Sequence, residues 1–149
     1  MKIGLLFGTF DPVHRGHIKI ASSLVKNNIV DRVWFVITPV SPFKTNQSIS
    51  SEEDRKNMLN LAINNNPKFS VSEIELQLPV PSYTANTLAY IKKNYPNNQF
   101  FIAMGADNYV NISKWKNHQY ILKNFKICVY KRESYVINNI IYIPGEYIN

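Results

Sequence analysis

The chain holds one cysteine and three histidines among its 149 residues, which narrows the metal and redox chemistry open to it. Cys128 has no second cysteine with which to form a disulfide or a thiolate cluster. It lies in an apolar run, so we expect a small buried core residue rather than a nucleophile. Zinc usually takes three or four protein ligands, so this histidine content argues against a zinc site. We therefore expect no metal site built from protein side chains.

Long apolar runs are also missing, since none approaches the roughly 18 residues that span a bilayer. The apolar start of the chain, residues 1–7, is too short for a signal peptide, because Asp11 and His14 follow almost at once. We therefore predict a buried first strand in a cytoplasmic protein that does not bind membranes.

Acidic residues are scarce, with 10 Asp and Glu against 17 Lys and Arg, which gives a formal charge of +7. Such a balance favours anionic partners, among them nucleic acid and phosphorylated small molecules. The basic residues are scattered, however, and the sequence shows no basic stripe with interleaved aromatic residues. Nucleic-acid binding therefore ranks last among the functions considered, and we expect no nucleic-acid partner.

Strand-like and helix-like patterns alternate along the chain, whose length suits one domain over residues 1–149. Ser50 followed by Glu53 predicts a capping box that opens the second helix, with Met58, Leu59 and Ala62 facing inward. The alternation predicts an α/β fold with a mainly parallel sheet, which binds ligands at the carboxyl ends of its strands. The expected strands are 2–7, 32–38, 69–74, 99–104, 125–130 and 140–143, and the expected helices are 17–26, 50–65 and 84–95.

The loop that leaves the first strand carries the strongest functional signal. It reads Gly-Thr-Phe-Asp-Pro-Val-His-Arg-Gly-His from Gly8 to His17. Gly8 and Gly16 permit a tight turn and close approach of the backbone to a ligand. His14 and His17 lie three residues apart at the helix start, where free N–H groups and the helix dipole attract phosphate. Paired imidazoles suit nucleotidyl transfer, which requires positioning and positive charge rather than a nucleophile.

The same loop resembles the signature of the HxGH nucleotidyltransferase superfamily, whose defining element is matched by His14, Gly16 and His17. The resemblance implies a Rossmann-like three-layer sandwich and direct attack of an acceptor phosphate on the α-phosphorus of ATP, with release of pyrophosphate. It implies that both histidines are catalytic and contact the ATP phosphates, which carry Mg²⁺. The ATP-binding residues that it implies in this loop are Gly8, Thr9, Phe10 and Gly16.

Residues 81–88 resemble the Pro-Ser-Tyr-Thr element of one branch, the bacterial nicotinate mononucleotide adenylyltransferases. The resemblance implies that Thr84 binds the nicotinate carboxylate. On chemistry alone, Ser82 or Thr84 is a plausible helix N-cap. For these residues a capping role is as probable as a ligand role, and both can hold.

Residues 105–108 and the later Trp115 resemble the Gly-x-Asp element and the downstream tryptophan of that branch. The resemblance implies ATP contacts from Gly105 and Asp107, and stacking of Trp115 on the pyridine ring of the substrate. Without such context, a tryptophan more often packs in a core or on a surface.

A third segment, Pro42-Phe43-Lys44, resembles the Pro-x-(His/Lys) loop of the branch and implies a catalytic Lys44 that brings charge to the phosphates. Arg55 fits an Arg-x-x-Met-Leu element, but a lone arginine is usually a solvated surface charge, so we leave it out of the predicted site. Arg132, just past an expected strand, is included as a substrate-binding residue.

The resemblance covers almost the whole chain and implies ATP and nicotinate mononucleotide as partners, with homo-oligomer formation left open. The branch also has an Ile-Ser-Ser-Thr-x-Ile-Arg element that binds ATP phosphates, and no such element precedes Asn149. We therefore expect a C-terminally short domain that binds ATP weakly and turns over slowly or not at all. The alternatives are a phosphopantetheine adenylyltransferase-like enzyme and a non-catalytic nucleotide-binding module.

Overall fold

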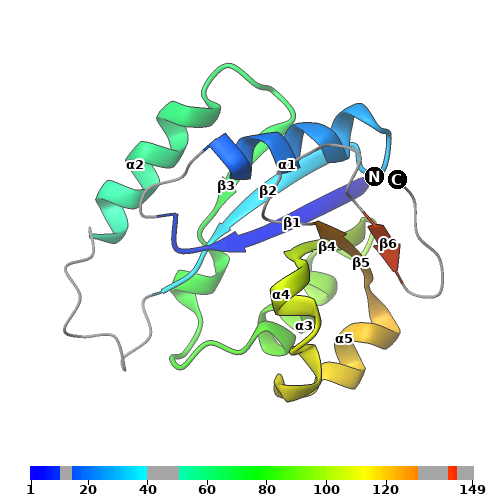
Figure 1. Ribbon diagram of the computed structural model, residues 1–149. Helices are drawn as coiled ribbons and strands as arrows, with labels where there is room; N and C mark the ends of the chain where they lie inside the picture. The colour runs from blue at the N-terminus through cyan, green and yellow to red at the C-terminus, as the bar shows by residue number, and fades with distance from the viewer. Residues whose placement is uncertain (11–14, 40–50, 131–140, 144–149) are drawn as a thin grey trace.

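A six-stranded sheet forms the centre of the protein, in the order β3-β2-β1-β4-β5-β6 (Figure 1). The computed structural model describes residues 1–10, 15–39, 51–130 and 141–143. The first five strands pair in parallel, and β6 is antiparallel to β5. The predicted α/β fold with a mainly parallel sheet is thus confirmed. The strands are β1 Lys2–Gly8, β2 Arg32–Ile37, β3 Phe69–Ser72, β4 Gln99–Gly105, β5 Lys126–Tyr130 and β6 Ile141–Ile143.

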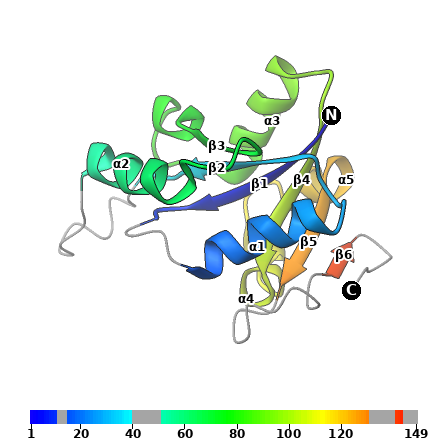
Figure 2. The ribbon, with the colours of Figure 1, turned by 90° about the horizontal axis from the view of Figure 1, so that it is seen from above.

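Helices cover both faces of the sheet and bury one apolar cluster against each (Figure 2). On one face, α1 (Arg15–Lys26) and α2 (Glu52–Ile63) contribute Ile20, Leu24 and Leu59. On the other face, α3 (Thr84–Asn94) and α5 (His118–Asn124) contribute Leu88, Ile91 and Ile121. This is the three-layer sandwich that the resemblance implied. The short elements are α4 (Ala106–Tyr109) and the 3₁₀ turns η2 (Ile74–Gln77) and η3 (Ile112–Lys114).

Three local predictions need correction. The expected strand over 69–74 ends at Ser72, because η2 begins two residues later. The cap of α2 is Ser51, whose Oγ accepts a 3.1 Å hydrogen bond from the Asp54 N–H, so the pair Ser50 and Glu53 does not open the helix. Ala62 is exposed, and its neighbour Ile63 is buried instead. The elements η3, α4 and α5 were not predicted, because each is too short for a clear helical period.

The position of β1 defines where a ligand can bind. The chain runs outward from β1 through β2 to β3, and then returns to the other side of β1 to form β4 and β5. The strand order therefore reverses between β1 and β4, and a crevice opens beyond the carboxyl ends of strands at such a point. The segments that follow β1 and β4 are those that carry the predicted ATP-binding residues.

Cys128 lies in the core at 1% exposure, as predicted. Burial raises the pKa of its thiol to about 12, so the reactive thiolate is scarce at neutral pH. No helix in the described part of the chain is long and apolar enough to cross a membrane.

A buried carboxyl group fixes the start of α3. Glu75, 4% exposed in η2, accepts a 2.7 Å hydrogen bond from the Thr87 hydroxyl, one turn into α3. Burial raises the pKa of Glu75 above its ordinary value of 4.5, although the hydrogen bond from Thr87 opposes this shift. The contact ties η2 to the helix whose first residue is Thr84.

The raised pKa of Glu75 predicts that the protein loses stability as the pH rises. The folded state favours the neutral carboxyl, so its contribution is complete below pH 4.5 and is lost as the pH rises through the raised pKa. Glu75→Gln should flatten the dependence of the free energy of unfolding on pH above 4.5, as measured by urea denaturation. An unchanged slope in Glu75→Gln would contradict the assignment.

Candidate functional site

The loop after β1 turns at Phe10, which has a left-handed backbone with a φ of 51°. A bulky residue rarely adopts this conformation, so its surroundings must hold it there. The Phe10 ring is buried and lies over Gly8, where an added Cβ would come within 3.1 Å of the ring atom Cε1. A side chain at Gly8 would therefore press on the Phe10 ring. The sequence analysis assigned the tight turn to Gly8 and Gly16, but the left-handed residue that the structure describes there is Phe10.

The Phe10 ring also contacts the candidate catalytic imidazole. Its centroid lies 5.0 Å from that of His17 with the two planes at 80°, and 5.8 Å from that of Phe35 in the core. A role for Phe10 in ATP binding would therefore rest on its main chain, since its side chain is in the core. Thr9 precedes it and is exposed at the carboxyl edge of the sheet.

His17 lies in the first turn of α1, which begins at Arg15, two residues earlier than predicted. The side chain is half-buried, and Gly16 beside it is buried. The first N–H groups of a helix have no partner within it, so an anion at this end is favoured. His17 and Gly16 both lie at this end of α1. His14, Lys44 and Arg132 lie outside the described residues.

Arg55 is the residue that the sequence analysis misjudged. It was taken for a solvated charge, but it is 1% exposed on α2. Its Nη1 donates one hydrogen bond to the Thr9 carbonyl and one to the Thr38 carbonyl, both 2.9 Å long. The match to the Arg-x-x-Met-Leu element was the available signal, and the usual exposure of arginine outweighed it.

The segment after β4 lies at the same edge of the sheet as the loop after β1. Gly105 is buried at the end of β4 and is the N-cap of α4, with a φ of −69° that any residue adopts. Backbone freedom is therefore not what this position requires of a glycine. Asp107 is the second residue of α4. It therefore lies just beyond the end of β4, the strand that pairs with β1.

Thr84 and Trp115, the predicted acceptor residues, line one cavity of about 60 Å³. Thr84 is the first residue of α3 and Trp115 ends η3, so two separate segments converge there. The N-cap of α3 is Tyr83, with no side-chain capping bond, so neither Ser82 nor Thr84 is the cap. The remaining lining residues were not predicted, and they are Phe7, Ile102, Ala103, Met104, Asn108 and Tyr130.

A cation–π contact joins the two segments that carry Thr84 and Trp115. Lys116 Nζ lies 4.5 Å from the centroid of the Tyr83 ring. Tyr83 directly precedes Thr84, and Lys116 directly follows Trp115. Such contacts contribute about 0.5–1 kcal/mol at exposed sites, which is enough to bias the two segments toward one another.

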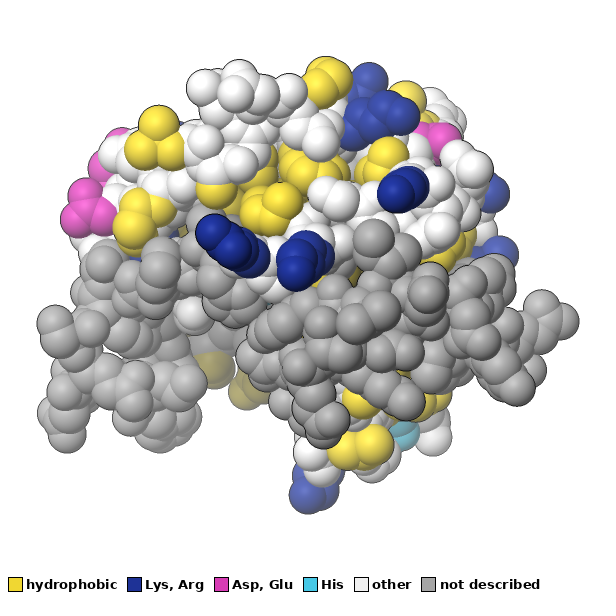
Figure 3. Space-filling view, turned by 45° about the horizontal axis from the view of Figure 1, so that its top comes forward, with side chains coloured by type: hydrophobic (Ala, Val, Ile, Leu, Met, Phe, Trp, Pro, Cys, Tyr) yellow, Lys and Arg dark blue, Asp and Glu magenta, His cyan; other side chains and the backbone are white. Residues whose placement is uncertain are grey.

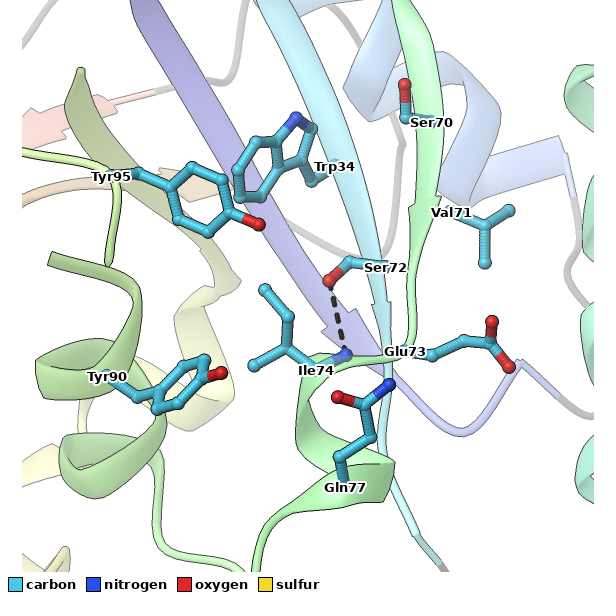
Figure 4. Close-up of a pocket in the computed structure, with 9 residues that line it drawn as sticks. All are labelled: Trp34, Ser70, Val71, Ser72, Glu73, Ile74, Gln77, Tyr90 and Tyr95. Atoms are coloured by element: carbon cyan, nitrogen blue, oxygen red, sulfur yellow. Dashed lines mark hydrogen bonds between the residues drawn. The ribbon is translucent and has the colours of Figure 1, made fainter. Parts of the chain in front are cut away.

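A larger cavity of about 440 Å³ lies on the α3 face beside the edge strand β3. Trp34, Tyr90, Tyr95 and Ile74 turn toward this hollow, and the Ser72 hydroxyl accepts a 3.4 Å hydrogen bond from the Ile74 N–H (Figure 4). None of its lining residues comes from the segment directly after β1 or from the segment directly after β4. Size alone therefore does not make it the nucleotide site.

Basic side chains on the face shown in Figure 3 are dispersed. Figure 3 shows Lys and Arg side chains separated by neutral surface on the face that it presents, not gathered in one stripe. Within the described ranges, no group of three or more His, Cys, Asp and Glu is placed to hold a metal ion.

Comparison with known proteins agrees with this geometry. The Cytidylyltransferase-like family model matches residues 5–146. A Cytophaga hutchinsonii protein named "Probable nicotinate-nucleotide adenylyltransferase" is 48% identical over 132 residues, which cover 89% of this chain and 69% of that protein. A protein of the same name from Flavobacterium psychrophilum is 45% identical over 132 residues, with 89% and 68% covered.

The fold has a solved counterpart. The structure of Plasmodium falciparum nicotinic acid mononucleotide adenylyltransferase complexed with NaAD matches with a TM-score of 0.73 at 22% identity, covering 91% of this chain and 66% of that one. The chain therefore spans 66% to 69% of the length of these three proteins. With its family model, close relatives and fold in agreement, the chain belongs to the nicotinate-nucleotide adenylyltransferases of the Cytidylyltransferase-like family.

Proposed function

We propose that the chain transfers AMP from ATP to nicotinate mononucleotide, giving nicotinate adenine dinucleotide and pyrophosphate. Family membership supports the activity, and one observation in the structure carries the assignment of the site. Thr84 and Trp115 share a cavity beside β4. The neighbouring strand is β1, and the helix that follows it, α1, carries His17. The pyridine end of an acceptor against Thr84 and Trp115, and a triphosphate at the start of α1, would therefore lie at neighbouring strand ends.

The acceptor side of the site combines an aromatic wall with a hydroxyl donor. Trp115 is half-buried in the cavity wall and offers a ring on which a pyridine can stack. The Thr84 hydroxyl can donate to the nicotinate carboxylate, and Asn108 adds an amide to the same wall. These groups select a flat ring with an anionic substituent.

The ATP side of the site provides positive charge and N–H donors without a nucleophile. An oxygen of the acceptor phosphate attacks the α-phosphorus, and the bond from that phosphorus to the oxygen of the β-phosphate breaks. Pyrophosphate leaves with the electron pair. His17 and His14 donate to phosphate oxygens, where negative charge accumulates in the transition state. In this proposal Lys44 brings further positive charge to the phosphates. Gly105 and Asp107 contact ATP.

Mg²⁺ fits this site as an ion held by the nucleotide phosphates. The described residues provide no cage of carboxylates, and a Mg²⁺ ion bound mainly through phosphates and water needs none. The ion would neutralise charge on the leaving pyrophosphate. His17 and the start of α1 would then orient the same phosphates from the protein side.

The alternatives predicted from the sequence have different standing. The names of the close relatives support nicotinate mononucleotide as acceptor and give no support to phosphopantetheine. A non-catalytic nucleotide-binding module would bind ATP and release no pyrophosphate, so turnover separates it from the enzyme.

Removal of the His17 imidazole should abolish most of the turnover while the fold remains. Loss of one donor to a developing negative charge typically lowers kcat about 100–1,000-fold. We expect His17→Ala to show this loss in a pyrophosphate-release assay with ATP, Mg²⁺ and nicotinate mononucleotide. Lys19→Ala, exposed on the same helix, is the matched control and should keep normal turnover. A folded His17→Ala variant with an unchanged kcat would refute the role.

The Thr84 hydroxyl should determine the preference for the acid form of the acceptor. A hydrogen bond to a charged group contributes about 1.5–3 kcal/mol, so Thr84→Val should raise the KM for nicotinate mononucleotide about 10–100-fold. The KM for the nicotinamide form, which has no carboxylate, should change less. Thr84→Ser retains the hydroxyl and should stay close to the wild type. Equal losses for both acceptors would show that Thr84 does not read the carboxylate.

A further inference from the structure

Arg55 occupies a place where helix electrostatics does not favour a cation. It lies in the first turn and a half of α2, three residues after Glu52, the first residue of the helix. The positive end of the helix dipole is unfavourable for a cation, and the neighbouring first-turn residues are all acidic and exposed. Arg55 is instead turned into the protein, so its position must be explained by the groups that it contacts.

Those groups are the carbonyls that follow two adjacent strands. Thr9 comes directly after β1 and Thr38 directly after β2, and one nitrogen of Arg55 donates to both at 2.9 Å. The Thr38 N–H donates to the Gly8 carbonyl at 2.8 Å, so the strand ends are already paired there. Arg55 extends this pairing by one residue, to the point where the chain leaves the sheet. Charge-assisted hydrogen bonds of this kind are stronger than neutral ones.

The residue after Thr9 is the strained Phe10, whose ring contacts His17. A left-handed phenylalanine persists only where neighbouring contacts fix it. Burial fixes the ring, and Arg55 fixes the carbonyl on the N-terminal side of the bend. Through this sequence of contacts, α2 controls the wall against which the imidazole at the start of α1 packs.

We propose that Arg55 is a positioning residue of the nucleotide site, which holds the Thr9–Phe10 bend and thereby the orientation of the His17 imidazole. The proposal rests on the proposed function for its effect on turnover, but its effect on His17 can be measured without substrate. Arg55 is assigned no contact with ATP. Its action passes through the main chain of Thr9 and the ring of Phe10.

The test compares Arg55→Met and Arg55→Lys with a matched control. Arg32→Met removes a second arginine whose Nη1 also donates to a main-chain carbonyl, that of Pro67 at 2.9 Å, but on the exposed surface. It therefore controls for the loss of one charge and of one arginine–carbonyl bond. Each variant is examined by circular dichroism for folding, by NMR of the His17 imidazole in the free protein, and by pyrophosphate release.

In Arg55→Met, the His17 imidazole resonances should shift toward those of an unstructured peptide, because the edge contact with the Phe10 ring is lost. The kcat should fall about 100-fold, as for a misplacement of about 1 Å. Arg55→Lys keeps a charged donor and should lie between Arg55→Met and the wild type in both measurements. Arg32→Met should match the wild type in both.

A folded Arg55→Met variant with wild-type imidazole resonances and kcat would overturn the proposal, since Arg55 would then serve stability alone. If Arg55→Met does not fold, Arg55→Lys decides by the same two measurements, and wild-type values in it would also overturn the proposal. A wild-type chain that binds ATP but releases no pyrophosphate would refute the proposed function instead, in favour of the non-catalytic nucleotide-binding module. The imidazole resonances would then still decide the role of Arg55.

Discussion

Parallel pairing of β1 with β2 on one side and β4 on the other is the constraint on which the rest of the structure depends. It brings two loops from distant parts of the chain to one edge, where the strand order reverses. Helix α1 can then present its N-terminus, and α3 its first residue, to that edge. No single motif could form this site, because its parts come from segments about a hundred residues apart in the sequence.

Much of this arrangement was predictable because the strands are long and apolar. The runs that became β1, β2, β4 and β5 have strong patterns, so their type and approximate bounds were correct. The glycine- and histidine-containing loop was recognisable because its residues are consecutive. The family, and with it the class of reaction, followed from that loop and from three weaker segments, and the comparisons confirm it.

The residues that escaped prediction are those whose role depends on tertiary contacts. Arg55 looks like a surface charge until the ends of β1 and β2 are seen to place two carbonyls beside it. Phe10 looks like a ligand residue in the motif, but its ring is in the core. Glu75 has no distinctive pattern, and its partner Thr87 is twelve residues away across a turn. Local propensity carries no information about such pairs.

The burial of Phe10 has a consequence for how the enzyme can evolve. Its ring is shared between the apolar cluster under α1 and the imidazole at the crevice, so packing and chemistry meet in one side chain. Substitutions in that cluster, such as at Phe35, would reach the loop after β1, to which we assign the phosphate site, without touching any substrate. Selection on turnover would therefore extend into the hydrophobic interior on the α1 face of the sheet.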